Sequence, residues 1–292
     1  MSKNHKKRGQ TLQIPKVILF TAKLISLVST KWVVRFAARL FTTPVRHKLP
    51  KRELKMNAGS RQQKLRVESI GKTVVVYQFG RAEKKVLLVH GWSGRGTQLV
   101  KFADELIRRD YSTVSFDAPA HGKSSGNTTL MPEFIETILE IDKKFGPFES
   151  AIGHSLGGMS LLNAARLGFK VNQMVVIGSG DIIKDIFDAF VFKMQLPHKI
   201  SDLMRDHFER KHHKTMADFS SYLSAQVIDI PVLVVHDEND AEVPVQCAHH
   251  IFSHLKNGQL LITHKLGHRK ILGDAQVIQK SLEFINAKKI QS

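Results

Sequence analysis

One serine of this chain stands where a reactive hydroxyl could be exposed at a sharp turn. The segment 153–158 reads Gly-His-Ser-Leu-Gly-Gly, after an apolar run and before a small-residue helical pattern. Glycines two positions before and after Ser155 allow a strand to turn tightly into a helix, because larger side chains there would collide with neighbouring elements. The turn would direct backbone N–H groups and a helix dipole at the target of the hydroxyl. Ser155 is therefore the predicted nucleophile.

A serine hydroxyl becomes a good nucleophile only when a general base removes its proton and an acid orients that base. An acid and a histidine that can reach Ser155 are therefore the partners that this prediction requires. Residues 230–236 form a short, β-branched apolar run that predicts a buried parallel strand. The loop that follows this strand carries four candidate acids, Asp237, Glu238, Asp240 and Glu242.

The candidate base is His268, which follows the last predicted strand, 259–263, in a Gly-His pair. A position after that strand brings it to the carboxyl edge of the sheet, where ligands bind in open α/β folds. His154 lies inside the turn, and His264 lacks the glycine before it. Four other histidines are predicted on polar helix faces, namely His212, His213, His249 and His250.

Acyl transfer also needs donors for a developing oxyanion, and loss of one donor typically costs about 100- to 1000-fold in rate. The backbone N–H of Leu156, directly after the nucleophile, is the first predicted donor. The second is expected in the loop after the strand 85–89, where the sequence His-Gly-Trp offers the Trp92 amide. Asp117 and His121 follow the next strand, and we expect them to hold their loop rather than to react.

Residues 65–292 resemble the α/β-hydrolase superfamily. Five short motifs carry the resemblance: His90-Gly91-Trp92, Asp117-Ala118-Pro119-Ala120-His121-Gly122, Gly153-His154-Ser155-Leu156-Gly157-Gly158, Asp240-Ala241-Glu242-Val243-Pro244 and Gly267-His268. The Asp-x-x-Val-Pro pattern is similar to the acid-bearing loop of that superfamily, which favours Asp240, with Asp237 as the alternative. The resemblance implies a serine hydrolase with Ser155, Asp240 and His268 as its triad.

Hydrolysis of a carboxylic ester with an apolar part, through an acyl-enzyme on Ser155, is the leading functional prediction. Thioester hydrolysis, amide hydrolysis and perhydrolase chemistry are alternatives, because one triad serves them all and the fold does not fix the substrate. A non-catalytic binding protein of the same fold is the alternative outside enzymes. We expect a small-molecule ester as the partner, no cofactor and no specific nucleic acid. No metal is predicted, because no Cys/His cluster has ligand spacing.

The 292 residues fit one α/β domain with extensions. Strands alternate with helical patterns, which predicts a doubly wound, mostly parallel sheet of about eight strands, with an antiparallel opening pair that turns at Gly71. The core is expected at 65–180 and 229–292. The intervening segment 181–228 has helical spacing and is predicted to be a cap. Its large residues either line an acyl pocket or pack within the cap: Phe187, Phe190, Phe192 and Met194.

Residues 1–64 are predicted to form a basic helical extension. The formal net charge is +18, and residues 1–65 hold sixteen lysines or arginines against one acid, Glu53. A helical pattern rich in apolar residues runs from Ile14 to Phe41. A cation near the bilayer centre costs about 2.5–3.5 kcal/mol, so the cations of this pattern argue against a membrane span. These cations are Lys16, Lys23, Lys31, Arg35 and Arg39.

Two interpretations of the extension remain. Residues 1–60 lie on an anionic membrane surface, or their apolar face packs on the hydrolase domain or on a second subunit. The first four cations favour membrane contact (Lys3, Lys6, Lys7 and Arg8). The lone Cys247, expected to be a small buried residue, and the lack of a secretory signal predict a cytoplasmic location, peripheral on the inner membrane face if lipid is bound. The oligomeric state is not indicated.

Overall fold

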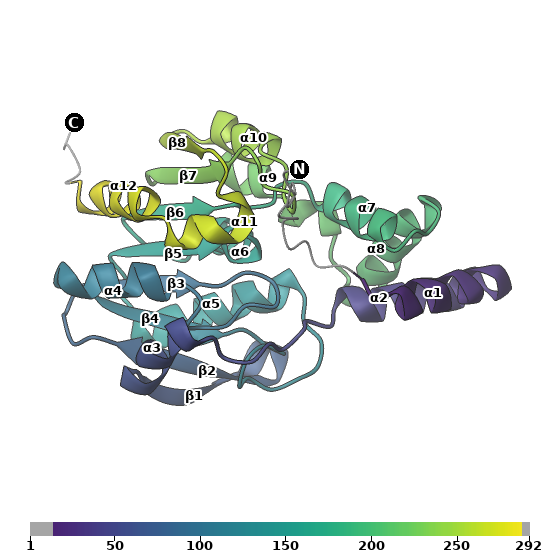
Figure 1. Ribbon diagram of the computed structural model, residues 1–292, viewed down its shortest axis with the longest axis horizontal. Coiled ribbons are helices and arrows are strands. Elements are labelled where there is room, and N and C mark those ends of the chain that lie inside the picture. The colour runs from purple at the N-terminus through teal and green to yellow at the C-terminus, as the bar shows by residue number, and fades with distance from the viewer. Residues whose placement is uncertain (1–13, 288–292) are drawn as a thin grey trace, which may run out of the picture.

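The computed structural model describes residues 14–287, which surround an eight-stranded sheet (Figure 1). The strand order is β1-β2-β4-β3-β5-β6-β7-β8. The strands from β3 to β8 run parallel, whereas β2 is antiparallel to both of its neighbours. This confirms the predicted α/β-hydrolase sheet. The strands are β1 (Arg61–Val67), β2 (Lys72–Phe79), β3 (Lys85–Val89), β4 (Ser112–Asp117), β5 (Ser150–His154), β6 (Gln173–Ile177), β7 (Val232–Asp237) and β8 (Gly258–Thr263).

The opening strand pair turns at Gly71, as predicted. Gly71 has a φ of 63°, in the left-handed region that glycine adopts without a steric penalty. The strand β1 begins at Arg61, so the last residues of the predicted 1–64 extension belong to the sheet.

Helices cover both faces of the sheet, because the central strands are apolar on both sides. Alternate residues of β3 divide between two cores, with Leu87 and Val89 in one and Val86 and Leu88 in the other. The first core also contains α5 and α6, and the second contains α4 and α12. The helices that flank the sheet are α4 (Val100–Arg108), α5 (Met131–Phe145), α6 (Leu156–Arg166), α10 (Gln246–His254), α11 (Gly267–Lys270) and α12 (Ala275–Asn286).

The segment 181–228 is helical and lies to one side of the sheet (Figure 1). It contains α7 (Ile183–Lys193), α8 (Lys199–His212), the 3-10 helix η3 (Met216–Phe219) and α9 (Ser221–Ala225). Phe187 and Val191 are buried, but Phe192 is 83% exposed. The interpretations that placed Phe192 in a pocket or in the core of the cap are therefore wrong. One step along a helix turns a side chain by about 100°, from the packed face to solvent.

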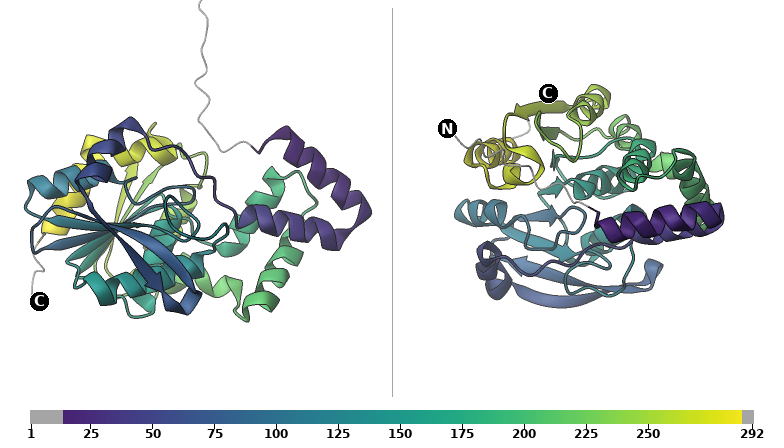
Figure 2. Two further views of the ribbon diagram at one scale, coloured as in Figure 1. Left: turned by 90° about the horizontal axis from the view of Figure 1, so that it is seen from below. Right: turned by 45° about the vertical axis from the view of Figure 1, so that its right-hand side comes forward.

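The N-terminal helices pack beside this segment (Figure 2). The predicted continuous pattern breaks at Ser29, which has an extended backbone and whose Oγ accepts a hydrogen bond from the Trp32 amide. The Phe41 ring stacks on Phe187 with centroids 4.6 Å apart, so this end of the extension packs on the protein. The elements are α1 (Lys16–Val28), α2 (Thr30–Phe41), the 3-10 helix η1 (Lys51–Glu53) and α3 (Leu54–Gly59).

No helix within residues 14–287 has both the length and the apolar character needed to cross a membrane. The cations expected to favour membrane contact, Lys3, Lys6, Lys7 and Arg8, lie outside the described residues.

Phe102 on α4 is fully buried in the core on one face of the sheet. We expect Phe102→Ala to lower the free energy of unfolding by about 3–5 kcal/mol, because the lost ring leaves a cavity. Phe192→Ala, at an exposed phenylalanine, serves as the control and should change it by less than about 0.5 kcal/mol. Urea denaturation followed by circular dichroism measures both, and equal losses would contradict the assigned burial.

Candidate active site

Ser155 occupies a strained turn between β5 and α6. Its φ of 54° and ψ of −121° lie outside the regions that residues with a side chain ordinarily adopt. The Ser155 amide donates a 2.8 Å hydrogen bond to the Ile177 carbonyl of β6, which anchors the turn. A side chain at Gly153 would lie 2.7 Å from the Gly157 carbonyl carbon, and one at Gly157 would collide with the Val89 carbonyl oxygen. Both glycines are therefore required by close packing.

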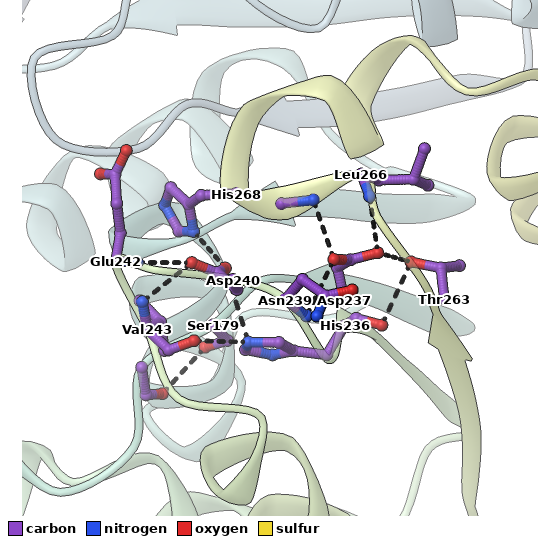
Figure 3. Close-up of polar contacts among 12 residues, drawn as sticks. Ser179, His236, Asp237, Asn239, Asp240, Glu242, Val243, Thr263, Leu266 and His268 are labelled. Atoms are coloured by element: carbon purple, nitrogen blue, oxygen red, sulfur yellow. Dashed lines mark hydrogen bonds and ion pairs between the residues drawn. The ribbon is translucent and has the colours of Figure 1, made fainter. Parts of the chain in front are cut away.

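Asp240 and His268 form a hydrogen-bonded pair at the carboxyl edge of the sheet (Figure 3). The His268 Nδ1 lies 2.6 Å from Asp240 Oδ2. Asp240 Oδ1 accepts hydrogen bonds from the amides of Glu242 and Val243, at 2.7 and 3.0 Å. Burial alone would raise the pKa of Asp240, but the His268 ring and these amides hold it below its ordinary value. The carboxylate is thus ionised and fixed in orientation.

Asp237, the alternative acid, has a different set of partners. Its carboxylate is fully buried and accepts hydrogen bonds from the amides of Leu266 and Gly267, at 3.0 and 2.9 Å. The Asn239 amide and the Thr263 hydroxyl also donate to it, at 3.0 and 2.8 Å. These bonds tie the loop after β7 to the loop that carries His268. Asp237 therefore positions the histidine loop rather than the imidazole.

Ser155, Asp240 and His268 approach one another around the end of β6. A side chain at Gly178, directly after β6, would lie 3.3 Å from His268 Nδ1 and 3.7 Å from Asp240 Oδ2. Ser155 is held to Ile177, the residue before that glycine. Among the described residues, Ser155 Oγ makes no hydrogen bond to His268. Nucleophile–base bonds are often long without substrate and tighten when it binds.

Two backbone amides beside the nucleophile have no protein acceptor. Neither the Trp92 nor the Leu156 N–H donates a hydrogen bond within the part of the chain that the structure describes. Leu156 is the first residue of α6, where N–H groups lack helical partners and the helix dipole favours negative charge. Both residues line the same cavity as Ser155. Unpaired donors at this point suit an anionic oxygen.

Asp117 and His121 hydrogen-bond to backbone groups, in agreement with the expectation that they hold their loop. Asp117 accepts bonds from the amides of Gly96 and Lys123, both at 2.7 Å. His121 Nε2 accepts a 3.0 Å bond from the Ser93 amide. Burial lowers the pKa of His121 to about 3, so its ring stays neutral and able to accept.

Two further histidines, which the sequence analysis did not assign to the site, contact the residues around His268 and Asp240. His154 Nε2 lies 2.9 Å from the His268 carbonyl oxygen, and burial lowers the pKa of His154 to about 3. His236 Nε2 lies 3.0 Å from the Val243 carbonyl oxygen and 3.5 Å from Asp240 Oδ2. The sequence gives one signal for these supporting roles, which is proximity along the chain. His154 directly precedes Ser155, and His236 lies four residues before Asp240.

Ser155 opens into a cavity of about 930 Å³, which we call the Ser155 cavity. Stretches of chain far apart in sequence form its wall. The sheet edge contributes Trp92, the segment 181–228 contributes α7, the N-terminal helices contribute a further side, and α10 contributes Cys247 and His250. The apolar residues of this lining include Ile14, Ile18, Phe41, Met159, Phe187, Phe190 and Met194.

A polar pair interrupts this apolar wall. His250 Nδ1 lies 2.5 Å from Asp181 Oδ2, and both residues line the Ser155 cavity. His250 is predicted on a polar helix face; its side chain is 40% exposed, and α10 also turns it toward the segment 181–228. Cys247, one turn earlier, is half-buried and lines the same wall, and burial raises the pKa of its thiol to about 11.

The sequence matches the model of a protein family described as the alpha/beta hydrolase family over residues 86–268. This match spans more than half of the chain and contains Ser155, Asp240 and His268, but not the N-terminal helices that line the cavity. The protein therefore belongs to the alpha/beta hydrolase family. A search of curated protein sequences found no match.

Solved structures with the same fold include an esterase from Exiguobacterium antarcticum, at 16% identity and a TM-score of 0.64, covering 78% of this chain and 100% of the esterase. Est1E from Butyrivibrio proteoclasticus, solved with ferulic acid bound, has 19% identity and a TM-score of 0.60, with 77% and 100% covered. A bromoperoxidase from Bacillus anthracis has 14% identity and a TM-score of 0.60, with 77% and 99% covered. Likeness at these identities establishes the fold.

The hydrogen bonds to Asp237 predict a pH-dependent contribution to stability. Burial alone would raise its pKa, but the amides and the Thr263 hydroxyl hold it below the ordinary value of 3.8. A lowered folded-state pKa stabilises the protein above that ordinary value, and this stability is lost as the pH falls through the folded pKa. Asp237→Asn should therefore lower the free energy of unfolding by about 1–3 kcal/mol at pH 7, and by less below about pH 4.

Urea denaturation at several pH values measures this difference. Glu238→Gln, at the exposed neighbouring carboxylate, is the control and should cost less than about 1 kcal/mol. A loss in Asp237→Asn that stays constant from pH 7 to pH 3.5 would refute the ionised role of Asp237.

Proposed function

We propose that the protein is a serine hydrolase that cleaves carboxylic esters with an apolar part. The observation that carries the proposal is the Asp240–His268 hydrogen bond of 2.6 Å at the sheet edge where Ser155 occupies its strained turn. Membership of the alpha/beta hydrolase family supports the reaction class. The esterase among the structures of the same fold supports the preference for esters.

In this proposal Ser155 Oγ attacks the ester carbonyl while His268 Nε2 takes the serine proton. Asp240 keeps the imidazole in the tautomer with Nδ1 protonated and stabilises its charged form. The amides of Trp92 and Leu156 donate to the oxyanion of the tetrahedral intermediate. His268 then gives the proton to the departing alkoxide, leaving an acyl group on Ser155. Water, deprotonated by His268, hydrolyses that acyl-enzyme and releases the acid.

The Ser155 cavity suits a substrate with a sizeable apolar group. Its volume of about 930 Å³ falls in the upper part of the range of roughly 300–1,000 Å³ typical of ligand sites. Phe187, Phe190 and Met194 provide apolar contacts from the segment 181–228, which we assign as the cap. The core is then 65–180 with 229–292, apart from the residues of β1 that precede 65.

Hydrolysis of thioesters, hydrolysis of amides and formation of peracids are alternative reactions of the same triad. A bromoperoxidase shares the fold, so chemistry other than ester hydrolysis is also compatible with it. A binding protein without turnover is the rival outside enzymes. The polarity of Asp181 and His250 in the cavity wall gives no preference among these substrates. The single cysteine of the chain supports a reducing, cytoplasmic location.

Hydrolysis of p-nitrophenyl esters from acetate to palmitate tests the proposal. We expect turnover by the wild type and a loss of at least about 1000-fold in kcat for Ser155→Ala, because no other group supplies the nucleophile. His268→Ala should lose a similar factor. The preferred chain length measures the depth of the Ser155 cavity.

Ser253→Ala, at an exposed serine of α10, is the matched control and should keep full activity. A fluorophosphonate probe that labels the wild type but not Ser155→Ala would show a reactive serine. Labelling without turnover of any ester would redirect the assignment to amides or thioesters. No labelling of the folded wild type would favour a binding protein.

A further inference from the structure

The helix α1 presents a continuous apolar surface away from the protein. Large side chains recur on one side of it at a spacing of three or four residues, which places them on one face. We call this set the outer face, and its members are between 48% and 86% exposed: Val17, Phe20, Leu24, Leu27 and Val28. Trp32, just after the break at Ser29, is 62% exposed as well.

The opposite side of α1 is also apolar and packs on the protein. Ala22 is fully buried, and Ile18 and Ile25 pack against the main core. A surface helix of a globular protein ordinarily has one apolar stripe facing the core and polar residues opposite. The helix α1 has two apolar faces, so packing on the protein accounts for only one of them. Exposed apolar patches of this kind mark interaction sites.

Cations border the outer face, and acids are absent from it. Residues 14–41 hold five lysines or arginines and no aspartate or glutamate. Lys16 and Lys23 are seven residues apart and lie along one edge of the outer face. The guanidinium of Arg35 lies 5.5 Å from the centre of the Trp32 ring. An apolar strip edged by cations is complementary to a surface with an apolar interior and anionic head groups.

We propose that the outer face of α1 docks onto the surface of an anionic lipid bilayer. The helix would lie in the plane of the surface, with Phe20, Leu24 and Leu27 among the acyl chains and the lysines at the phosphates. A second copy of the chain is a poorer occupant. An antiparallel two-fold contact between outer faces would align the lysines of both copies along one seam, and neither face has acids to neutralise them.

Docking of α1 would bring the Ser155 cavity to the membrane. Ile18 of α1 lines that cavity, together with Ile14 and Pro15 just before the helix, so the docking helix also forms part of one cavity wall. If the proposed function holds, docking would bring the cavity near esters that partition into the bilayer. The docking itself does not depend on that function.

Vesicle sedimentation with the full chain tests the docking. We compare vesicles of phosphatidylcholine alone with vesicles that also contain phosphatidylglycerol. The wild type should sediment with the anionic vesicles, and raised salt should weaken binding. The triple variant Phe20→Ser, Leu24→Ser, Leu27→Ser should bind at least about tenfold more weakly, because it removes most of the apolar area of the outer face.

The matched control exchanges three equally exposed apolar residues elsewhere, as Leu167→Ser, Phe192→Ser, Val227→Ser. It should bind like the wild type. Circular dichroism melting establishes that both triple variants are folded. Ester hydrolysis in solution, measured separately, reports on the proposed function, so failure of docking and failure of catalysis are distinguishable.

Three outcomes would overturn the docking proposal. The wild type could stay in the supernatant with anionic vesicles, or it could bind neutral and anionic vesicles equally. The outer-face variant could also bind as well as the wild type. A wild type that is dimeric without lipid, by light scattering, and an outer-face variant that is monomeric would assign the face to self-association.

Discussion

The close approach of α6 to the strands β3 and β5 is the constraint on which the site depends. Gly153 and Gly157 leave no room for a β-carbon between the turn and the neighbouring backbone. This packing holds Ser155 in a backbone conformation that costs roughly 1–3 kcal/mol for a residue with a side chain. The cost is offset by the buried strands on both sides. As a result of this conformation, Ser155 and Leu156, the first residue of α6, line the same cavity.

The two aspartates after β7 show how burial and hydrogen bonding divide similar residues between tasks. Asp237 accepts bonds from amides and a hydroxyl and links two loops, whereas Asp240 keeps one oxygen for an imidazole. A buried carboxylate oxygen without a hydrogen-bond donor lowers the stability of the fold. Both oxygens of Asp237 and of Asp240 accordingly have hydrogen-bond partners. These hydrogen bonds tie the loop that carries His268 to the sheet edge.

The wall of the Ser155 cavity is built from segments that lie far apart in the sequence. Phe41 of α2 stacks on Phe187 of α7, and both line the cavity in front of Ser155. The N-terminal helices are therefore part of the pocket and also carry the exposed outer face of α1. The helix α1 therefore contributes both to the lining of the pocket, through Ile18, and to the exposed apolar surface.

The sequence by itself determined the features that depend on short stretches of chain. The glycines around Ser155, the apolar runs of the strands and the turn at Gly71 are local, and their positions agree with the structure. The break at Ser29 was missed because an apolar period runs through it.

Only the tertiary structure decided which face of each element meets another. Periodicity indicates that a helix has an apolar side, but it does not say what that side contacts. The exposure of Phe192, the position of His250 in the cavity wall and the partners of Asp237 all depend on residues distant in sequence. The two apolar faces of α1 have the same origin, because packing on α2 and the cavity covers one and leaves the other to solvent.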